Sequence, residues 1–418
     1  MTSSFKHIAM LSTHGYFDPI PLLGETDTGG QVLYVLELSK ALARKGIKVD
    51  IFTRWFDHNR QQINPLKDCP DVRVIRIPAG SWEFVIKEEI YELLPELTGN
   101  LASFIRKYNL DYDIFHGHYV DAGIVTIEME KIFRKPAFFT AHSLGAWKRE
   151  RMDGDPLEME IQYHFTHRIA EEKRIYDTLR GHTVTSLLQL EKLRELYDYQ
   201  GDNVEIIPPG VNIHKFKPLA PSESPRKTGL PENYIFCLSR VDSNKGYDLL
   251  LNAFARVCEE IDNIYLVTGG GSAHPQAREQ EVLDMMHRIM KEKHIENKIV
   301  FVGHVEERLM VSYYQNARFF VMPSIFEPFG MTTQEAMASG IPVIASRFGG
   351  IKTVLTHEKD GLLIDPKDED EFAGTMIRLL KDKAYRDQLG IEASKLIRRN
   401  FSWEAMAKRH LNFYNKYC

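Results

Sequence analysis

Short apolar runs alternate, along the first half of the chain, with longer stretches in which apolar residues recur every three or four positions. The first run, residues 7–12, ends in a loop, as a buried strand does. Residues 31–42 have helical spacing, Gly46 follows as the expected C-cap, and residues 48–53 again have strand character. Strand, glycine loop, helix and strand form a βαβ unit, which predicts a parallel sheet. Further strands are expected at residues 72–77, 114–116, 137–140, 183–186 and 204–207.

The alternation breaks after Ile207 and begins again at Tyr234. Residues 218–231, between the two series, are rich in proline, serine and charge, which is typical of a linker. Strands of the second series are expected at residues 234–238, 264–267, 300–302, 319–322 and 343–345. Two series of similar length predict an α/β protein with two doubly wound domains that face each other. Ligands are expected in the cleft between them, since such sheets bind ligands beyond the carboxyl ends of their strands.

The domain boundaries follow from this pattern. Residues 1–212 are expected to form the first domain and residues 213–400 the second. Residues 401–418 have a helical pattern, and we expect this helix to cross back to the first domain.

The composition of the chain excludes several classes of protein. The chain has 418 residues, 43% of them hydrophobic and 27% charged, which is ordinary for a globular protein. Its formal net charge of -5 argues against general binding to nucleic acid or to an anionic membrane. Four distant cysteines fit neither a metal site nor a disulfide framework, and they suit a reducing compartment. No signal peptide or membrane span is recognised, so the expected location is the cytoplasm.

The strongest chemical signal lies in residues 324–343. A strand ends there, a Pro-Phe-Gly loop turns, and a helix is expected to begin at Thr332 or Thr333, where its exposed amides suit a phosphate. Glu335, expected near the first turn, would be stabilised by about 0.3–1 kcal/mol and would accept ribose hydroxyls. Glu327 precedes the loop and can reach a sugar hydroxyl. The alternative is that Glu335 serves only the helix start and that the loop is only a turn.

Two basic residues, Arg240 and Lys245, follow the first strand of the second series. At a strand's carboxyl end they would neutralise the negative charge of a departing diphosphate. A solvated basic loop is the alternative meaning of such a pair. The glycines at 269–271 are weak support on their own, because glycine-rich loops occur in many contexts.

In the first half, Gly29 and Gly30 precede Gln31 at the start of a helix. Glycine lets a ligand approach the backbone, and the helix start favours an anion. The spacing does not fit a dinucleotide fingerprint, so a nicotinamide dehydrogenase gains little support. His142 directly follows a strand, which is an active-site position in this architecture, although a packed or capping histidine is the alternative.

Three further basic residues, Lys87, Lys148 and Arg168, are scattered along the first half. Individually they are unremarkable. Together they would surround a phosphate if the fold brings them close.

The residues of the second half match a known pattern, because Glu327 and Glu335 form an E-x7-E motif within Glu-Pro-Phe-Gly and Glu-Ala-Met-Ala-Ser-Gly segments. Over essentially its whole length the chain resembles the retaining family 4 glycosyltransferases. This resemblance implies a GT-B fold, in which two Rossmann-like, doubly wound domains face each other across a cleft.

Within that family the chain resembles the sucrose-phosphate synthase and mannosylfructose-phosphate synthase group, through residues 12–16, 27–31, 142–148 and 244–250. The resemblance implies transfer of glucose or mannose from a UDP-, ADP- or GDP-hexose to fructose 6-phosphate. One departure from the group is Ile86, which stands where the group has a proline before the basic residue.

The resemblance also assigns roles to individual residues. The fructose 6-phosphate site would comprise Gly29, Gln31, Lys87, Tyr119, Asp121, Lys148 and Arg168. The sugar nucleotide would be bound by Gly30, Arg240, Lys245, Glu327, Phe329, Gly330, Met331 and Glu335. The residues expected to act in catalysis are His142, Arg240, Lys245 and Glu327.

The implied reaction retains the anomeric configuration, with front-face attack and the departing phosphate taking the acceptor proton. Neither a cofactor nor a metal is expected, because no Asp-x-Asp pair follows a strand and two bases can stabilise the leaving group. Sucrose synthase-like transfer to free fructose, an inverting GT-B enzyme and a binding paralogue without activity are the alternatives. The sequence leaves open the donor base, the choice between glucose and mannose, and the oligomeric state.

Overall fold

The computed structural model describes residues 5–19, 29–152, 154–220, 222–223, 226–271, 277–325 and 327–418. The chain divides into two compact units. Unit 1 contains Met1–Gly210 together with Trp403–Cys418, and unit 2 contains Val211–Ser402. Unit 1 is therefore discontinuous in sequence, because the C-terminal helix belongs to it although all of unit 2 comes between.

Unit 1 is built on one eight-stranded sheet with the order β3-β4-β2-β1-β5-β6-β7-β8. Its strands are β1 His7–Leu11, β2 Lys48–Trp55, β3 Ile63–Leu66, β4 Cys69–Pro78, β5 Ile114–His118, β6 Ala137–Thr140, β7 Gly181–Val184 and β8 Val204–Ile206. All pairings are parallel except that of the edge strand β3 with β4. The sequence pattern did not predict β3, a four-residue strand that contains Pro65, a residue confined to edge positions in sheets.

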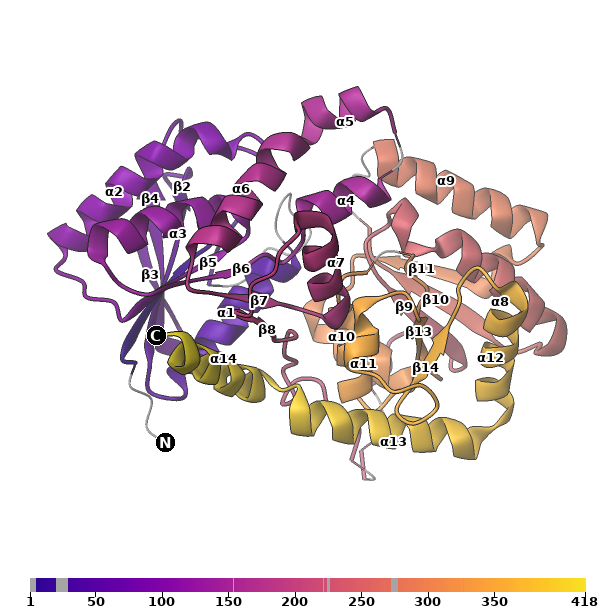
Figure 1. Cartoon of the computed structure of the whole chain (residues 1–418). Helices are drawn as coiled ribbons and strands as arrows, with labels where there is room; N and C mark the ends of the chain where they lie inside the picture. The colour runs from indigo at the N-terminus through magenta and orange to yellow at the C-terminus, as the bar shows by residue number, and fades with distance from the viewer. Residues whose placement is uncertain are drawn as a thin grey trace. The chain divides into compact units, whose positions relative to one another are not determined.

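Helices cover both faces of this sheet. They are α1 Gly30–Ala43, α2 Leu94–Lys107, α3 Val120–Phe133, α4 Gly145–Arg151, α5 Pro156–Tyr163, α6 Phe165–Thr178, α7 Leu187–Tyr197 and α14 Trp403–Tyr417, with a 3-10 turn, η1, at Ile90–Leu93. Figure 1 shows α2, α3 and α6 over one face and α1 and α14 over the other. Phe413 of α14 packs on Phe138 of β6 with ring centroids 5.1 Å apart.

Unit 2 has a six-stranded, all-parallel sheet with the order β11-β10-β9-β12-β13-β14. Its strands are β9 Tyr234–Leu238, β10 Tyr265–Gly269, β11 Ile299–Gly303, β12 Phe320–Met322, β13 Val343–Ser346 and β14 Leu362–Ile364. Its helices are α8 Tyr247–Glu260, α9 Ala277–Glu292, α10 Glu307–Asn316, α11 Met331–Ala338, α12 Glu369–Lys381 and α13 Lys383–Asn400, with 3-10 turns η2 Ser243–Lys245, η3 Glu296–Lys298 and η4 Gly350–Thr353.

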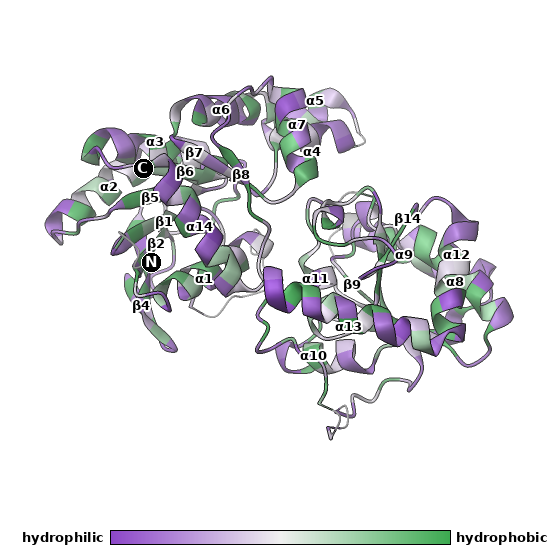
Figure 2. Cartoon of the chain, turned by 60° about the horizontal axis from the view of Figure 1, so that its bottom comes forward, coloured by the Kyte–Doolittle hydropathy of each residue, from purple (hydrophilic) through white to green (hydrophobic). Residues whose placement is uncertain are grey.

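A continuous apolar core lies between this sheet and helices α8, α9 and α12. Helix α13 buries Leu389, Ala393 and Ile397 at four-residue spacing, so one of its faces is apolar. Green and purple bands alternate along α13 in Figure 2, as this pattern requires. Among the described residues, no helix combines the length and the apolar character that crossing a bilayer demands.

Both sheets have one point at which the strand order reverses. In unit 1 it lies between β1 and β5, and in unit 2 between β9 and β12. The loops that leave the carboxyl ends of such neighbours diverge to opposite faces, which opens a crevice where ligands bind in doubly wound folds. Each switch point therefore locates a candidate half-site within its own unit.

Buried histidines connect the core of unit 1 to α14. His116 Nδ1 lies 2.7 Å from the Tyr414 hydroxyl, and His410 Nε2 lies 3.1 Å from the Tyr34 hydroxyl. Burial lowers the pKa of His410 to about 4, and burial together with neighbouring histidines lowers the pKa of His116 well below its usual value. These side chains are neutral in the folded state at neutral pH.

We predict that acidification unfolds unit 1. Below about pH 6.5 the unfolded chain takes up protons that the folded cluster does not, so each such histidine costs stability by up to about 1.4 kcal/mol per pH unit. Thermal melting between about pH 7 and pH 5 measures this loss. His410→Gln, which cannot be protonated, should give a shallower dependence, and an unchanged slope would contradict the assignment.

Candidate functional site

The loop after β9 positions Lys245 at the switch point of unit 2. Asp242 caps the 3-10 turn η2 by accepting from the Asn244 amide at 3.3 Å. Gly246 follows at a φ of +69°, and a side chain there would come within 2.5 Å of the Pro323 carbonyl oxygen. The Ile325 amide donates to the Asn244 carbonyl at 2.9 Å. The loops after β9 and β12 are thus held together, backbone against backbone.

Across this junction, Lys245 Nζ lies 2.7 Å from Glu327 Oε2. The Lys245 side chain is 8% exposed and that of Glu327 20% exposed. Burial alone would raise the pKa of Glu327, but the charge and hydrogen bond of Lys245, the Phe329 amide and the charge of exposed Arg240 together lower it. Glu327 is therefore an ionised acceptor that contacts Lys245 and lies in the field of Arg240.

The segment after Glu327 turns sharply into α11. Gly330 has a φ of +92°, and the helix begins at Met331, one residue before the expected start. Gly350 donates its amide to the Glu327 carbonyl at 2.9 Å and packs so closely on the Pro328 carbonyl that a side chain at position 350 would clash. The Phe329 amide, expected to bind substrate, donates to the Glu327 carboxylate in this structure. The cavity beside Glu327 and Gly330 is only about 10 Å³, too small for a sugar.

The position and the pKa of Glu335 differ from what the sequence predicted. It is the fifth residue of α11, beyond the first turn, so the expected stabilisation of its carboxylate by the helix start is wrong. Burial instead raises the pKa of Glu335 to about 7, although the Tyr314 hydroxyl donates to it at 3.0 Å. The carboxylate is poised between its charged and neutral forms near neutral pH.

At the switch point of unit 1, Gln31 joins the ends of the two central strands. It lies in the first turn of α1, and its Nε2 donates to the Ser12 hydroxyl at 3.1 Å and to the His118 carbonyl at 3.2 Å. A side chain at Gly29 would meet no protein atom within 4 Å, so the backbone before the helix faces open space. Exposed Gly30 begins α1. Asp27 and Thr28 lie outside the described residues.

Asp121 is fully buried and holds the loop that follows β1. Its carboxylate accepts from the Thr13 hydroxyl, and its Oδ2 lies 2.9 Å from His14 Nδ1. Tyr119, at the start of α3, has φ +76° and ψ +164°, a region that costs a residue other than glycine about 1–3 kcal/mol. Such strain concentrates at functional sites.

Arg168 is buried against Tyr119, with its guanidinium carbon 4.7 Å from the ring centroid. Its Nε donates to Glu172 at 2.8 Å, and its second terminal nitrogen donates to the Ser143 hydroxyl at 2.9 Å. Burial would lower the pKa of Arg168, but the Glu172 carboxylate raises it above its usual value. Arg168 thus has a structural partner that the sequence analysis did not identify, although the i, i+4 spacing could have indicated it.

The two lysines of the predicted acceptor site lie in different surroundings. Lys87 Nζ is 3.2 Å from Glu88, and its charge, like that of Arg168, acts on Tyr119. Lys148, in α4, has its Nζ 4.3 Å from the ring centroid of Tyr163. The structure therefore gathers Lys87, Tyr119 and Arg168, while Lys148 contacts an aromatic ring outside that group.

His142 follows β6 with a φ of +59°. Its Nε2 lies 3.0 Å from His118 Nδ1, and its ring meets Tyr34 edge-on at 4.9 Å. Burial and the nearby His14 and His410 lower the pKa of His142 to about 3. A neutral imidazole has one donor and one acceptor, so His142 can orient a hydroxyl but is not a charged acid at neutral pH.

Sequence reasoning assigned no role to five residues of these networks: Thr13, His14, Ser143, Glu172 and Tyr314. The first two directly follow β1, so the strand-end rule that selected His142 could also have selected them. Nothing in the local sequence around Tyr314 signals its contact with Glu335, which lies 21 positions away. Among the described residues, no group of three or more histidine, cysteine or acidic side chains could hold a metal ion.

Two families match consecutive parts of the chain. Residues 28–215 match Glycosyltransferase Family 4, and residues 222–396 match Glycosyl transferases group 1. Mannosylfructose-phosphate synthase from Agrobacterium fabrum is 33% identical, over 98% of this chain and 91% of its own length. D-inositol 3-phosphate glycosyltransferase from Corynebacterium efficiens is 31% identical, over 98% of this chain and 95% of its own length.

Solved structures agree with these matches. Sucrose-phosphate synthase from Thermosynechococcus elongatus superposes with a TM-score of 0.84 and is 30% identical, covering 98% of each chain. HepE from Anabaena, solved with UDP and glucose, has a TM-score of 0.72 at 16% identity, covering 98% of this chain and all of that one. This second likeness concerns the fold alone, two parallel-sheet α/β domains of the GT-B type.

We predict that Glu335 makes unit 2 less stable as the pH rises. Between about pH 4.5 and pH 7 the folded state keeps a proton that the unfolded state has released, so stability falls by at most about 3 kcal/mol across that window. Glu335→Gln keeps an acceptor for Tyr314 but does not titrate. The difference in unfolding free energy between variant and wild type should therefore grow in favour of the variant from about pH 5 to pH 8. A constant difference would contradict the raised pKa.

Proposed function

This chain belongs to the family 4 glycosyltransferases, and we propose that it transfers a hexose from a sugar nucleotide to fructose 6-phosphate with retention at the anomeric carbon. The observation that carries the proposal is the contact of Lys245 with Glu327 at the switch point of unit 2. It supplies a cation for a diphosphate and an ionised acceptor for sugar hydroxyls at one place.

The donor half is proposed to bind the nucleotide diphosphate through Arg240, Lys245 and the start of α11. Charge builds up on the leaving diphosphate as the glycosidic bond breaks, and preorganised cations stabilise that charge without reorganising. Glu327 would accept hydroxyls of the transferred hexose, and Glu335 would accept those of the ribose. Because Glu335 titrates near neutrality, donor affinity is expected to improve as this residue ionises.

The acceptor half is proposed to bind a phosphate on a polyhydroxylated ring. The relatives' names share this feature: a mannosylfructose phosphate, a sucrose phosphate and an inositol 3-phosphate. Lys87 and Arg168 supply positive charge around Tyr119, and Lys148 would supply a third cation from α4, which packs on the helix α6 that carries Arg168. A neutral acceptor such as free fructose carries no charge for these cations to bind, which argues against sucrose synthase-like chemistry.

The proposed mechanism is front-face substitution. The acceptor hydroxyl attacks the anomeric carbon on the side from which the diphosphate leaves, and the departing phosphate oxygen takes the hydroxyl proton. His142 is neutral, so it would hydrogen-bond the hexose rather than donate a proton to the leaving group. We propose that no metal is required, since Arg240 and Lys245 carry the charge that a divalent cation would otherwise carry.

A second acceptor, D-inositol 3-phosphate, is favoured by relatives that are about as similar to this chain as the fructose-phosphate enzyme is, at 31% identity. Both acceptors present a phosphate and ring hydroxyls, so the same cations would serve either.

The function is tested by assaying purified protein with UDP-glucose, ADP-glucose and GDP-mannose against fructose 6-phosphate and D-inositol 3-phosphate, with and without excess EDTA. We expect release of nucleoside diphosphate that depends on a sugar-phosphate acceptor, survives EDTA and yields a product with the donor's anomeric configuration by proton NMR. Tight donor binding with no transfer to either acceptor would overturn the proposal.

For the acceptor side, Lys148→Ala is the cleaner test, because Arg168→Ala would leave Glu172 buried without its partner. We predict that Lys148→Ala raises the KM for fructose 6-phosphate about tenfold or more and leaves the donor KM unchanged. Lys131→Ala, which removes a 58% exposed lysine from α3, is the matched control. If Lys148→Ala weakened donor binding instead, the assignment of Lys148 to the acceptor site would be wrong.

For the donor side, we predict that Lys245→Ala and Glu327→Ala each lower kcat by about 10²–10³. Lys395→Ala, which removes the exposed lysine of a surface pair with Glu392, controls for the loss of a lysine–glutamate contact in unit 2. Circular dichroism checks that each variant is folded. A normal turnover in either variant would contradict the donor assignment.

A further inference from the structure

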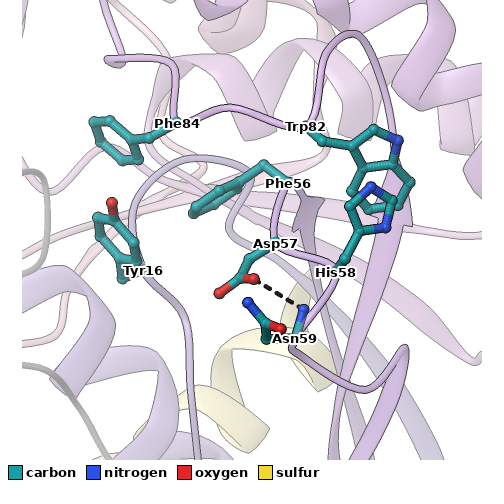
Figure 3. Close-up of a pocket in the computed structure, with 7 residues that line it drawn as sticks. All are labelled: Tyr16, Phe56, Asp57, His58, Asn59, Trp82 and Phe84. Carbon is teal, nitrogen blue, oxygen red and sulfur yellow. Dashed lines mark hydrogen bonds between the residues drawn. The ribbon is translucent and has the colours of Figure 1, made fainter.

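An open pocket of about 350 Å³ lies in unit 1, apart from every residue assigned above (Figure 3). Four aromatic side chains line it: Tyr16, Phe56, Trp82 and Phe84. His58, Asp57 and Asn59 complete the lining. The residues come from the segments that follow β1, β2 and β4, so the pocket stands at the carboxyl edge of the sheet.

The rings form two packed groups. Tyr16 and Phe84 stack almost in parallel with centroids 4.9 Å apart, and Phe56 meets both edge-on. On the other side His58 stacks on Trp82 at 3.6 Å. Trp82 nevertheless remains 42% exposed, so part of its indole is open to a ligand.

The wall that carries Trp82 is held from beneath by Arg54. This arginine is 3% exposed. Its guanidinium donates hydrogen bonds to three backbone carbonyls: those of Ala79 at 2.8 Å, Glu83 at 2.8 Å and Ser81. A buried cation that binds three carbonyls of one short loop fixes the path of that loop. The pocket wall is therefore preorganised.

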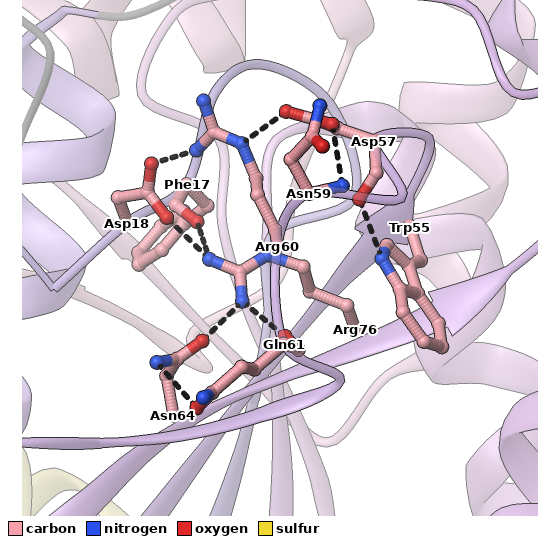
Figure 4. A network of polar contacts seen from close by, with 9 residues as sticks. All are labelled: Phe17, Asp18, Trp55, Asp57, Asn59, Arg60, Gln61, Asn64 and Arg76. Atoms are coloured by element: carbon pink, nitrogen blue, oxygen red, sulfur yellow. Dashed lines mark hydrogen bonds and ion pairs between the residues drawn. The ribbon is translucent and has the colours of Figure 1, made fainter.

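A second polar network fixes the opposite wall (Figure 4). Arg60 and Arg76 both pair with Asp18, two residues beyond Tyr16, and Arg76 also donates to the Phe17 carbonyl at 3.0 Å. Arg60 Nε lies 3.0 Å from Asp57 Oδ2, so the same arginine joins the Tyr16 loop to the polar side of the pocket. The segments after β1 and β2 are thus cross-linked by charge.

The pocket residues and the proposed acceptor groups follow neighbouring strands of one sheet. In the strand order β4-β2-β1-β5-β6, the pocket residues follow the first three strands. Of the acceptor groups, Lys87 also follows β4, and the others follow β1, β5 and β6. Two pocket residues are also close in sequence to residues of the acceptor side. Tyr16 closely follows His14, and Phe84 closely precedes Lys87.

The lining selects one class of ligand. Aromatic faces bind apolar surface, and the histidine, carboxylate and amide offer hydrogen bonds at its edge. An organic cation is disfavoured, because Asp57 is already paired with Arg60, and Arg60 itself lies 5.5 Å from the Tyr16 centroid. A sugar ring has an apolar face and a rim of hydroxyls, so it matches both parts of the lining.

We propose that this aromatic pocket binds a second sugar ring, so that the acceptor side accommodates a saccharide larger than fructose 6-phosphate. The proposal rests on the proposed function, because it extends the acceptor site of that transferase. Trp82 would cover one face of the ring, and Asp57 and Asn59 would bond its hydroxyls.

The test is direct binding of neutral disaccharides to the full chain. Sucrose, maltose and cellobiose are titrated separately, with saturation-transfer difference NMR as the readout. At least one should bind saturably, and Trp82→Ala should weaken it about tenfold or more, which corresponds to about 1.4 kcal/mol. Trp82→Phe keeps a ring and should stay within about threefold of wild type. Tyr108→Ala, which removes a ring that is 45% exposed elsewhere in unit 1, should change nothing.

Two results would overturn the proposal: no saturable binding of any of the three disaccharides, or equal binding by wild type and Trp82→Ala. These outcomes are separate from a failure of the proposed function. If the pocket alone is wrong, transfer to fructose 6-phosphate persists without disaccharide binding. If the transferase proposal alone is wrong, disaccharides bind in a Trp82-dependent way while no sugar phosphate is glycosylated.

Discussion

The contact between Lys245 and Glu327 joins residues 82 positions apart, and it exists because β9 and β12 are neighbours at the point where the strand order of unit 2 reverses. The loops that follow these strands pack backbone against backbone at Gly246, where a side chain would come within 2.5 Å of the Pro323 carbonyl oxygen. Unit 1 repeats this arrangement at β1 and β5, where Gln31 ties the strand ends together. The same topological constraint thus builds both half-sites.

Burial of charge gives each half-site its chemistry. Isolated in a protein interior, Glu327 would be neutral, but Lys245 and Arg240 keep it ionised. Glu335 accepts a hydrogen bond from the neutral Tyr314 hydroxyl, and burial raises its pKa to about 7. A buried ion pair of this kind contributes little net stability, since desolvation offsets attraction. Its position at the switch point therefore favours a role in substrate binding over a role in folding stability.

Sequence alone predicted most of the sheet, because parallel strands buried on both faces are continuous apolar runs. It missed β3 and β14, which are short and lie at sheet edges. The motif around Glu327 and Glu335 gave the family, confirmed by the matched families and relatives. The motif did not predict the raised pKa of Glu335, since that pKa depends on the burial of the carboxyl group beside Tyr314. Nor did it give the partners of Arg168 and Asp121, or the aromatic pocket, whose residues are dispersed over three loops.

Whether the acceptor carries a phosphate is measured most directly by comparing kcat/KM for fructose 6-phosphate with kcat/KM for fructose, using one donor. Loss of two charge-assisted contacts of about 1.5–3 kcal/mol each predicts a preference of at least about a hundredfold for the phosphorylated sugar. Equal values would contradict the phosphate site and would assign the basic residues of unit 1 to the stability of its loops.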